Sequence, residues 1–289
     1  MRRYGIESGR LDFFQSLKVL AILSGLVLAM ASSACTIFIV SRGGQVFAAG
    51  NEDEDNVEKN AKHYVRFVPA NNEKATLGYV SFGYKGNPFS DESAMNEAGL
   101  FYDFNALDKL DVARLDKPKG KFNAINEMLT TCRTVDQAVK FIETVDLPFI
   151  SSAQMVIGDA TGASAIVERH TTTWRCKGAD YQIGTNFRTS ETPLEKITCN
   201  RFKACNLELG MNRPLDLPSV VDLLKTTKAA PKSGTQTWYS LVCDLKHQRV
   251  NLYRKGDFAH TTSFLLADEL KKGARKYDMD EFISAQPNK

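Results

Sequence analysis

The sequence predicts an α+β protein in which antiparallel sheets carry helices that are set apart from the strands. Short segments rich in β-branched and aromatic residues follow one another closely at the start of the chain, and similar segments return in its middle and near its end. Helical spacing is confined to blocks between these groups, unlike the regular strand–helix alternation of a parallel α/β fold. Turn residues such as Asp159–Gly162 indicate tight hairpins between neighbouring strands.

The individual elements follow from these patterns. Strands are predicted at Cys35–Ser41, Gln45–Gly50, His63–Val68, Thr76–Phe82, Gly99–Asn105, Gln154–Gly158, Ala163–Glu168, Thr172–Cys176, Trp238–Cys243 and Arg249–Tyr253. Helices are predicted at Phe122–Thr131, Val135–Val145, Pro193–Leu209, Ser219–Thr226 and Ala267–Gly273. The block from Phe122 to Leu147 is expected to cover one face of a sheet.

Composition limits the classes of function. The 289-residue chain is 43% hydrophobic and 25% charged, with a formal net charge of +3, which is typical of a globular protein. It has no dense basic run and no alternation of basic and aromatic residues, so we expect no nucleic-acid partner. Neither an internal repeat nor a low-complexity linker divides it, and we therefore predict one folded domain.

The N-terminal segment has the order of a secretory signal peptide. Basic residues precede an apolar run from Val19 to Met30, and the small residues Ala31–Ala34 follow. The apolar run is too short to span a bilayer comfortably. We therefore expect residues 1–34 to be removed, leaving a mature domain of residues 35–289 that is secreted or periplasmic and has no stable membrane anchor.

Cleavage after Ala34 would give Cys35 a free α-amino group, and two functions are compatible with that. In an N-terminal nucleophile hydrolase, the α-amino group is the base for the thiol of its own residue. In a lipid-anchored cell-surface binding protein, the cysteine is acylated and no catalysis occurs. Ser32 stands where lipoprotein signals favour leucine, and Cys35 opens directly into an apolar strand instead of a polar tether. Both features favour the nucleophile.

The other cysteines and the histidines indicate no metal site. Five cysteines besides Cys35 allow at most two disulfides, and the sequence leaves their pairing open: Cys132, Cys176, Cys199, Cys205 and Cys243. No cysteine or histidine spacing is of the zinc type, and the histidines lack metal-like partners: His63, His170, His247 and His260. We expect no metal and no cofactor.

Four motifs occur in order along the mature chain: Cys35–Thr36 with Ala49–Asp53, Met95–Leu100, the hairpin Met155–Gly162 with Ile183–Phe187 downstream, and Cys199–Phe202. Together they resemble the choloylglycine hydrolases and their relatives, which include penicillin V acylases and isopenicillin N acyltransferases. The resemblance runs from Cys35 to about Tyr277. It implies a four-layer αββα sandwich of the N-terminal nucleophile type. It also implies hydrolysis of a linear amide bond in a small molecule through a thioester, with acyl transfer and a homo-oligomer left open.

The same resemblance implies roles for individual residues. Cys35 would be the nucleophile, and Asp53 would hold its amino group. Asn186 would donate to the oxyanion or orient the amino terminus, and Arg201 would bind a carboxylate, either that of Asp53 or one on the substrate. Asn105 lies near the family's side-chain oxyanion donor. Its offset differs by one residue, and because such a shift reverses the face of a strand, its direction is left open.

One departure from the bile-salt pattern bears on the substrate. Gly50 stands where those enzymes have an arginine, so an anionic substrate gains no bidentate contact there. The acidic run Glu52–Asp55 is expected to make the rim of the site negative and to favour cationic amines. We therefore expect an amide with an apolar acyl part or a small amine, and we do not expect bile salts to be favoured.

Overall fold

The computed structural model describes residues 35–55, 62–84, 91–111, 115–120, 123–229 and 235–285. All of these residues belong to the unit Ser33–Lys289. The expected signal peptide, residues 1–34, lies outside the described residues, and its removal stays a prediction. Among the residues that are described, no helix is long and apolar enough to cross a membrane.

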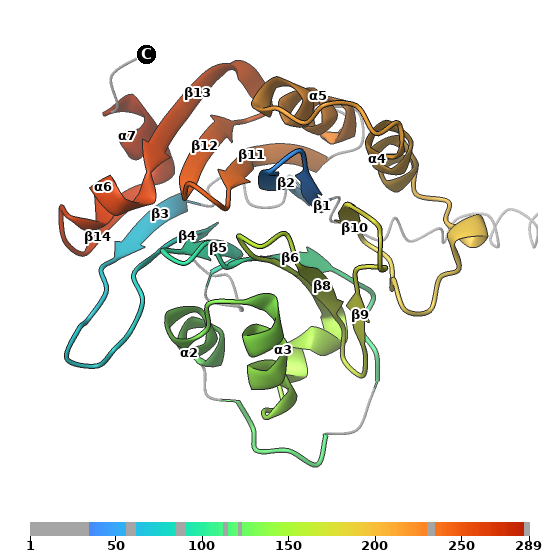
Figure 1. Ribbon diagram of the computed structural model, residues 1–289, viewed down its shortest axis with the longest axis horizontal. Helices are drawn as coiled ribbons and strands as arrows, with labels where there is room; N and C mark the ends of the chain where they lie inside the picture. The colour runs from blue at the N-terminus through green and yellow to red at the C-terminus, as the bar shows by residue number, and fades with distance from the viewer. Residues whose placement is uncertain are drawn as a thin grey trace, which may run out of the picture. The chain divides into compact units, whose positions relative to one another are not determined.

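Two antiparallel sheets form the centre of the fold (Figure 1). The first has the order β10-β1-β2-β11-β12-β13, with bounds Tyr181–Gly184, Thr36–Arg42, Gln45–Asp55, Thr235–Asp244, Arg249–Arg254 and Asp257–Leu265. The second has the order β14-β3-β4-β5-β6-β7-β8-β9, with bounds Arg275–Asp278, His63–Val68, Tyr79–Tyr84, Ser93–Asn96, Phe101–Ala106, Ala153–Gly158, Ser164–Val167 and Thr172–Trp174. The predicted antiparallel pairing is confirmed.

Helices cover the outer face of each sheet (Figure 1). On the first sheet lie α4 (Asn200–Gly210) and α5 (Leu217–Thr227), and on the second α2 (Ala124–Thr131) and α3 (Val135–Glu143). The short helices α6 (Leu266–Leu270) and α7 (Met279–Ser284) flank β14. The described residues also include the 3-10 segments η2 (Pro148–Ser152) and η3 (Leu194–Lys196). The four-layer αββα sandwich is therefore confirmed.

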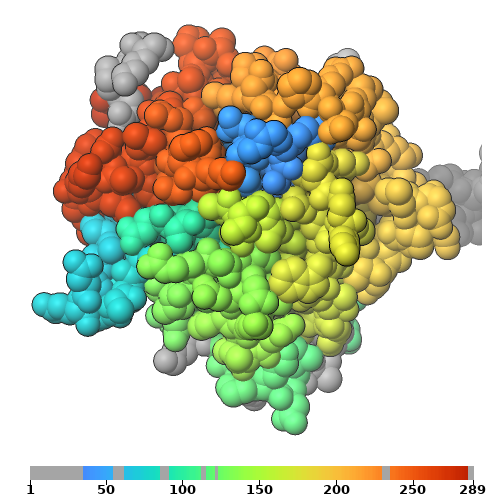
Figure 2. Space-filling view, in the orientation of Figure 1, coloured from blue at the N-terminus to red at the C-terminus, as the bar shows by residue number. Residues whose placement is uncertain are grey.

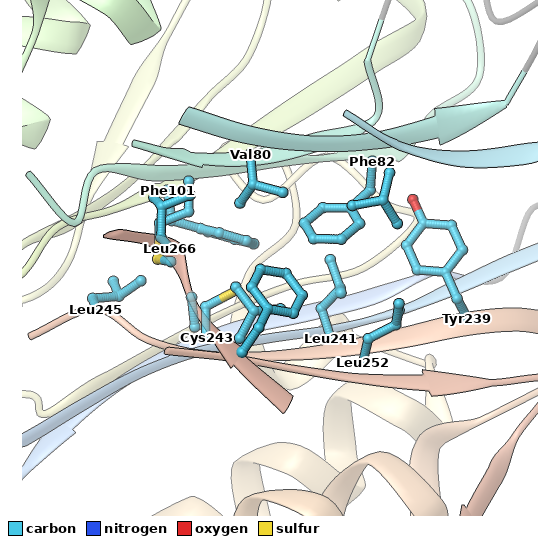
Figure 3. Close-up of a cluster of buried hydrophobic side chains, with 14 of the residues drawn as sticks. Val80, Phe82, Phe101, Tyr239, Leu241, Cys243, Leu245, Leu252 and Leu266 are labelled. Atoms are coloured by element: carbon cyan, nitrogen blue, oxygen red, sulfur yellow. The ribbon is translucent and has the colours of Figure 1, made fainter. Parts of the chain in front are cut away.

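Strand alternation divides the buried side chains among the three spaces between these layers. Along β1, Ile37 and Ile39 point between the sheets, whereas Phe38 and Val40 pack against α4 and α5. Figure 3 shows the apolar part of the central layer, where Phe82 and Phe101 of the second sheet face Leu241 of the first. We call this central layer the inter-sheet space. Its filling by large apolar side chains supplies the main driving force for joining the two sheets.

Several elements differ from the predicted ones. The strand expected to end at Gly50 continues to Asp55, because β11 pairs with β2 along nearly its whole length. The helix expected over Pro193–Leu209 is instead the η3 turn followed by α4. The strands β5, β10, β13 and β14 and the helix α7 were not predicted, because they are short or, as in β13, lie at a sheet edge and carry many exposed polar residues. The five cysteines other than Cys35, all within the described residues, form no disulfide.

The turn between β5 and β6 offers a test of the packing. Gly99 has φ +78°, and a Cβ added there would overlap the carbonyl oxygen of Leu245, whereas Gly178, with φ +86°, has open space around it. We expect Gly99→Ala to lower the free energy of unfolding by about 3 kcal/mol, since strain and steric overlap add. The control Gly178→Ala carries the backbone strain alone, about 1 kcal/mol. Urea denaturation measures both, and equal losses would contradict this packing.

Candidate active site

Cys35 lies immediately before β1 and is only 5% exposed. Its position continues the alternation of Ile37 and Ile39, so its thiol points into the inter-sheet space. In the space-filling view the blue area of the β1–β2 segment is bordered by orange and yellow segments (Figure 2). The small exposed fraction of Cys35 shows that the surrounding elements largely close its side chain off from solvent.

The thiol is surrounded by acceptors from the end of β2. Its Sγ lies 3.6 Å from Oε2 of Glu52 and 3.6 Å from the backbone oxygen of Asp53. Burial raises the pKa of the Cys35 thiol well above its ordinary value, and the negative charges of Glu52 and Asp53 raise it further. A high pKa keeps the proton on sulfur, so a base must remove it before the sulfur can attack.

Asp53 is buried on the opposite face of β2 and is held by hydrogen bonds. The hydroxyl of Thr237 accepts a hydrogen bond from Ala229 N at 2.9 Å and donates its proton to Oδ1 of Asp53. Burial raises the pKa of Asp53 to about 6, although the Thr237 hydrogen bond, the charge of Arg201 and the Ala229 N–H group all oppose the rise. Asp53 is thus a positioned carboxyl group that is ionised at neutral pH.

A β-bulge in β11 makes this contact geometrically possible. Thr237 is opposite Asp53 and Tyr239 is opposite Glu52, so one extra residue, Trp238, lies between two consecutive partners on β2. Such a bulge re-aims the side chains on either side of it. Here it allows Thr237 to reach Asp53 on the helix-facing side while Tyr239 stays in the inter-sheet space.

Arg201, in the first turn of α4, joins three parts of the site. Its guanidinium group donates to the backbone oxygen of Cys35, to Oγ1 of Thr36 at 2.8 Å and to Oδ1 of Asn186 at 3.0 Å. Asn186 follows β10 and donates from Nδ2 to the backbone oxygen of Ala106, at the end of β6, at 2.9 Å. Arg201 and Asn186 therefore connect the start of β1 to both sheets. The structure brings Cys35, Asp53, Asn186 and Arg201 together, as the resemblance of their motifs implies.

Asn105 points into the same inter-sheet space as Cys35, which answers the question of its direction. It is fully buried, and within the described part of the chain neither its Oδ1 nor its Nδ2 has a hydrogen-bond partner. A Cβ on Gly184 would lie 2.9 Å from this Nδ2, so the glycine of β10 makes room for the amide. A buried amide without partners is costly unless something else accepts its hydrogen bonds.

Glu52 and Asp103 are acidic residues for which no role inside the site was predicted from the sequence. Glu52 is 3% exposed and Asp53 is fully buried, so the prediction that these two residues belong to an acidic rim is wrong. Both point into the protein because β2 extends past Gly50. Asp103 of β6 is also fully buried, and its Oδ2 lies 2.8 Å from where a Cβ on Gly50 would be. An aspartate inside the apolar run Phe101–Phe104 was a signal that could have revealed it.

The acidic side chains of the site raise the question of a metal ion. In the part of the chain that the structure describes, no group of three or more His, Cys, Asp or Glu side chains is placed to hold a metal ion. The site contains a thiol, a carboxylate on the adjacent strand, an arginine that donates to the backbone oxygen of the cysteine, and a buried amide. These are groups for acid–base and nucleophilic chemistry.

Comparison with known families gives one match. The profile of the acyl-coenzyme A:6-aminopenicillanic acid acyl-transferase family matches residues 40–201, more than half of the chain. The match ends at Arg201 and includes Asp53, Asn105 and Asn186. A comparison with curated proteins finds no match.

Solved structures share the fold at low sequence identity. A variant of the conjugated bile acid hydrolase from Clostridium perfringens is 14% identical with a TM-score of 0.61, covering 84% of this chain and 97% of that one. The penicillin V acylase from Agrobacterium tumefaciens is 16% identical with a TM-score of 0.58, covering 84% and 91%. At such identities the likeness establishes the architecture alone.

Proposed function

Since this chain belongs to the acyl-coenzyme A:6-aminopenicillanic acid acyl-transferase family, we propose that it cleaves a linear amide bond with Cys35 as an N-terminal nucleophile. The observation that carries the proposal is the position of Cys35. Its thiol is buried beside polar groups, its backbone oxygen is held by Arg201, and the carboxyl group of Asp53 is fixed on the adjacent strand. Nothing in this arrangement is needed for a lipid anchor.

The reaction proposed requires removal of residues 1–34, which exposes the α-amino group of Cys35. This amino group takes the thiol proton while Sγ attacks the amide carbon, and the ammonium form is stabilised by the Asp53 carboxylate. The unpartnered Nδ2 of Asn105 donates to the oxyanion, while Asn186 orients Arg201. The ammonium group then protonates the leaving amine, and a thioester on Cys35 remains.

Water or an amine can resolve this thioester, which gives hydrolysis or acyl transfer. The family's name describes an acyltransferase, and of the structural relatives one is named a hydrolase and another an acylase, so both products are measured in the test below. We also propose export to the periplasm or the medium, on the sequence of residues 1–34 alone.

The surroundings of Gly50 support the proposal that bile salts are not the preferred substrate. Asp103 of the opposite sheet occupies the space in which any side chain at position 50 would begin. An arginine would have to displace this carboxyl group. Position 50 therefore lies next to an acidic group, whereas the bile-salt pattern has a cation there. This difference disfavours a substrate whose acyl or amine part is anionic.

A substrate panel tests both the reaction and its preference. Glycocholate, penicillin V, N-acyl amino acids, N-acyl homoserine lactones and N-acyl polyamines are assayed at matched concentrations, with and without an added acceptor amine. We expect kcat/KM to be highest for an amide without a negative charge near the scissile bond. If glycocholate ranked first, the substrate proposal would be wrong.

The same panel is run with two variants of the nucleophile. Cys35→Ala is expected to lower kcat on the best substrate by at least ~10³-fold, because it removes the attacking atom. Cys35→Ser is expected to keep weak activity, since the α-amino base is unchanged. Thermal unfolding at the wild-type temperature is the control for folding, and hydrolysis retained by Cys35→Ala would exclude the mechanism.

The pKa of Asp53 predicts the acid limb of the pH profile. Because the carboxylate must be ionised to hold the α-ammonium, log kcat/KM is expected to fall below about pH 6. Thr237→Val removes a hydrogen bond that lowers this pKa, so the limb is expected to move to higher pH. Ser240→Ala is the matched control: its hydroxyl also donates to β2, but to Asn51 at 2.7 Å. A Thr237→Val limb that stays in place would contradict the role given to Asp53.

A further inference from the structure

Asp103 reaches across the inter-sheet space from β6 to β2. Its Oδ1 accepts a hydrogen bond from the backbone N of Phe104 at 2.7 Å, which fixes the carboxyl group. Its Oδ2 is directed at Gly50, where only the absence of a side chain leaves room for it. An aspartate of one sheet is thus held against the backbone of the other, two residues from Glu52.

The carboxyl groups of Glu52 and Asp103 interact, because both point into the inter-sheet space and Oδ2 of Asp103 lies beside Gly50, two residues from Glu52 on the same face of β2. Within the described residues, no donor reaches Oε1 of Glu52 or Oδ2 of Asp103. Burial raises the pKa of both groups well above the ordinary values, and for Glu52 the charge of Asp103 raises it further. Two neighbouring buried carboxyl groups that each keep one oxygen without a donor cannot both be ionised, so one proton lies between them.

This carboxyl pair contacts the proposed nucleophile through Glu52, whose Oε2 is 3.6 Å from the Cys35 Sγ. Other titratable groups that face this space include Glu54 of β2, Glu92 before β5, His63 of β3, and Tyr239 and Cys243 of β11. Asp53 and Arg201 lie on the helix-facing side. Glu92 accepts a hydrogen bond from the Tyr239 hydroxyl at 2.7 Å, and its charge interacts with those of Glu52 and Glu54.

We propose that Glu52 and Asp103 share one proton and that the single negative charge left on the pair controls when the Cys35 thiol releases its own proton. The pair keeps sulfur protonated in the resting site and favours the positive charge that forms on the α-amino group during attack. Because nucleophilicity rises with the proton affinity of the sulfur, the thiolate formed at that moment is a strong nucleophile. Glu52 and Asp103 act here as positioning residues for the proton and do not form bonds to the substrate. The inference rests on the proposed role of Cys35.

Isosteric amide variants place the charge differently and so test the pair. In Glu52→Gln the amide donates to Asp103, which moves the negative charge away from the sulfur. In Asp103→Asn the amide donates to Glu52, which places the whole charge beside the sulfur. The double variant has no charge. Glu92→Gln is the matched control, because it removes a carboxyl group that interacts through its charge with the pair itself.

The readout is the ultraviolet absorbance of the thiolate as a function of pH in the purified mature protein without substrate. For each variant, the spectrum of the same variant with Cys35→Ala is subtracted, so that only Cys35 contributes. We expect the midpoint to be highest in Asp103→Asn, then wild type, then Glu52→Gln, and lowest in the double variant, with about one pH unit between the extremes. Glu92→Gln is expected to shift the midpoint less than Glu52→Gln does, because its charge acts on the sulfur through the pair.

Two results would overturn the inference. A midpoint below wild type in Asp103→Asn would mean that both carboxyl groups are ionised in the native site. A double variant equal to wild type would mean that the pair is neutral or not coupled to the sulfur. Because the titration needs no turnover, the predicted order together with an inactive protein would retain the pair and reject the proposed amidase.

Discussion

The antiparallel register of β1 and β2 is the constraint on which the rest of the site depends. Thr36 is opposite Asn51 and Ile37 is opposite Gly50, so the alternation of side chains is locked in both strands. Cys35 and Glu52 consequently face the inter-sheet space, whereas Thr36 and Asp53 face the helices. A slip of one residue would exchange the two faces and separate the thiol from Glu52 and the carboxylate from Thr237. The two faces supply different parts of the chemistry: the attacking atom on one, and the support for its amino group on the other.

The helices α4 and α5 hold this register at the start of β1 and the end of β2. Asn51 donates to the backbone oxygen of Leu224 in α5 at 3.0 Å and accepts from Ser240 of β11 at 2.7 Å, which ties the end of β2 to a helix and a strand. Arg201 of α4 holds the start of β1 through the backbone oxygen of Cys35. Each contact is buried or partly buried and satisfies polar groups that would otherwise be costly. The outer helices are therefore positioning elements for the nucleophile as well as covers for the sheet.

The sequence allowed the fold class and most of the candidate site to be predicted, because both rest on local signals. Apolar periodicity identified the central strands and the helices α2, α3 and α5, and the order of motifs selected Cys35, Asp53, Asn186 and Arg201. The edge strand β13 was not predicted, since many of its residues are exposed and polar. The contacts of Thr237 and Asp103 were not predicted for another reason. They depend on a bulge and on the meeting of two sheets, and neither is encoded in the spacing of residues along one strand.

The account requires above all that Cys35 is the first residue of the functional protein and that its α-amino group is unmodified. The intact mass of the mature chain, produced with residues 1–34 in a host that secretes it, measures this directly. We predict the mass of residues 35–289 with no addition. A diacylglyceryl group on Cys35 would identify a lipid-anchored protein instead, and an active chain that still carries residues before Cys35 would contradict the proposed mechanism.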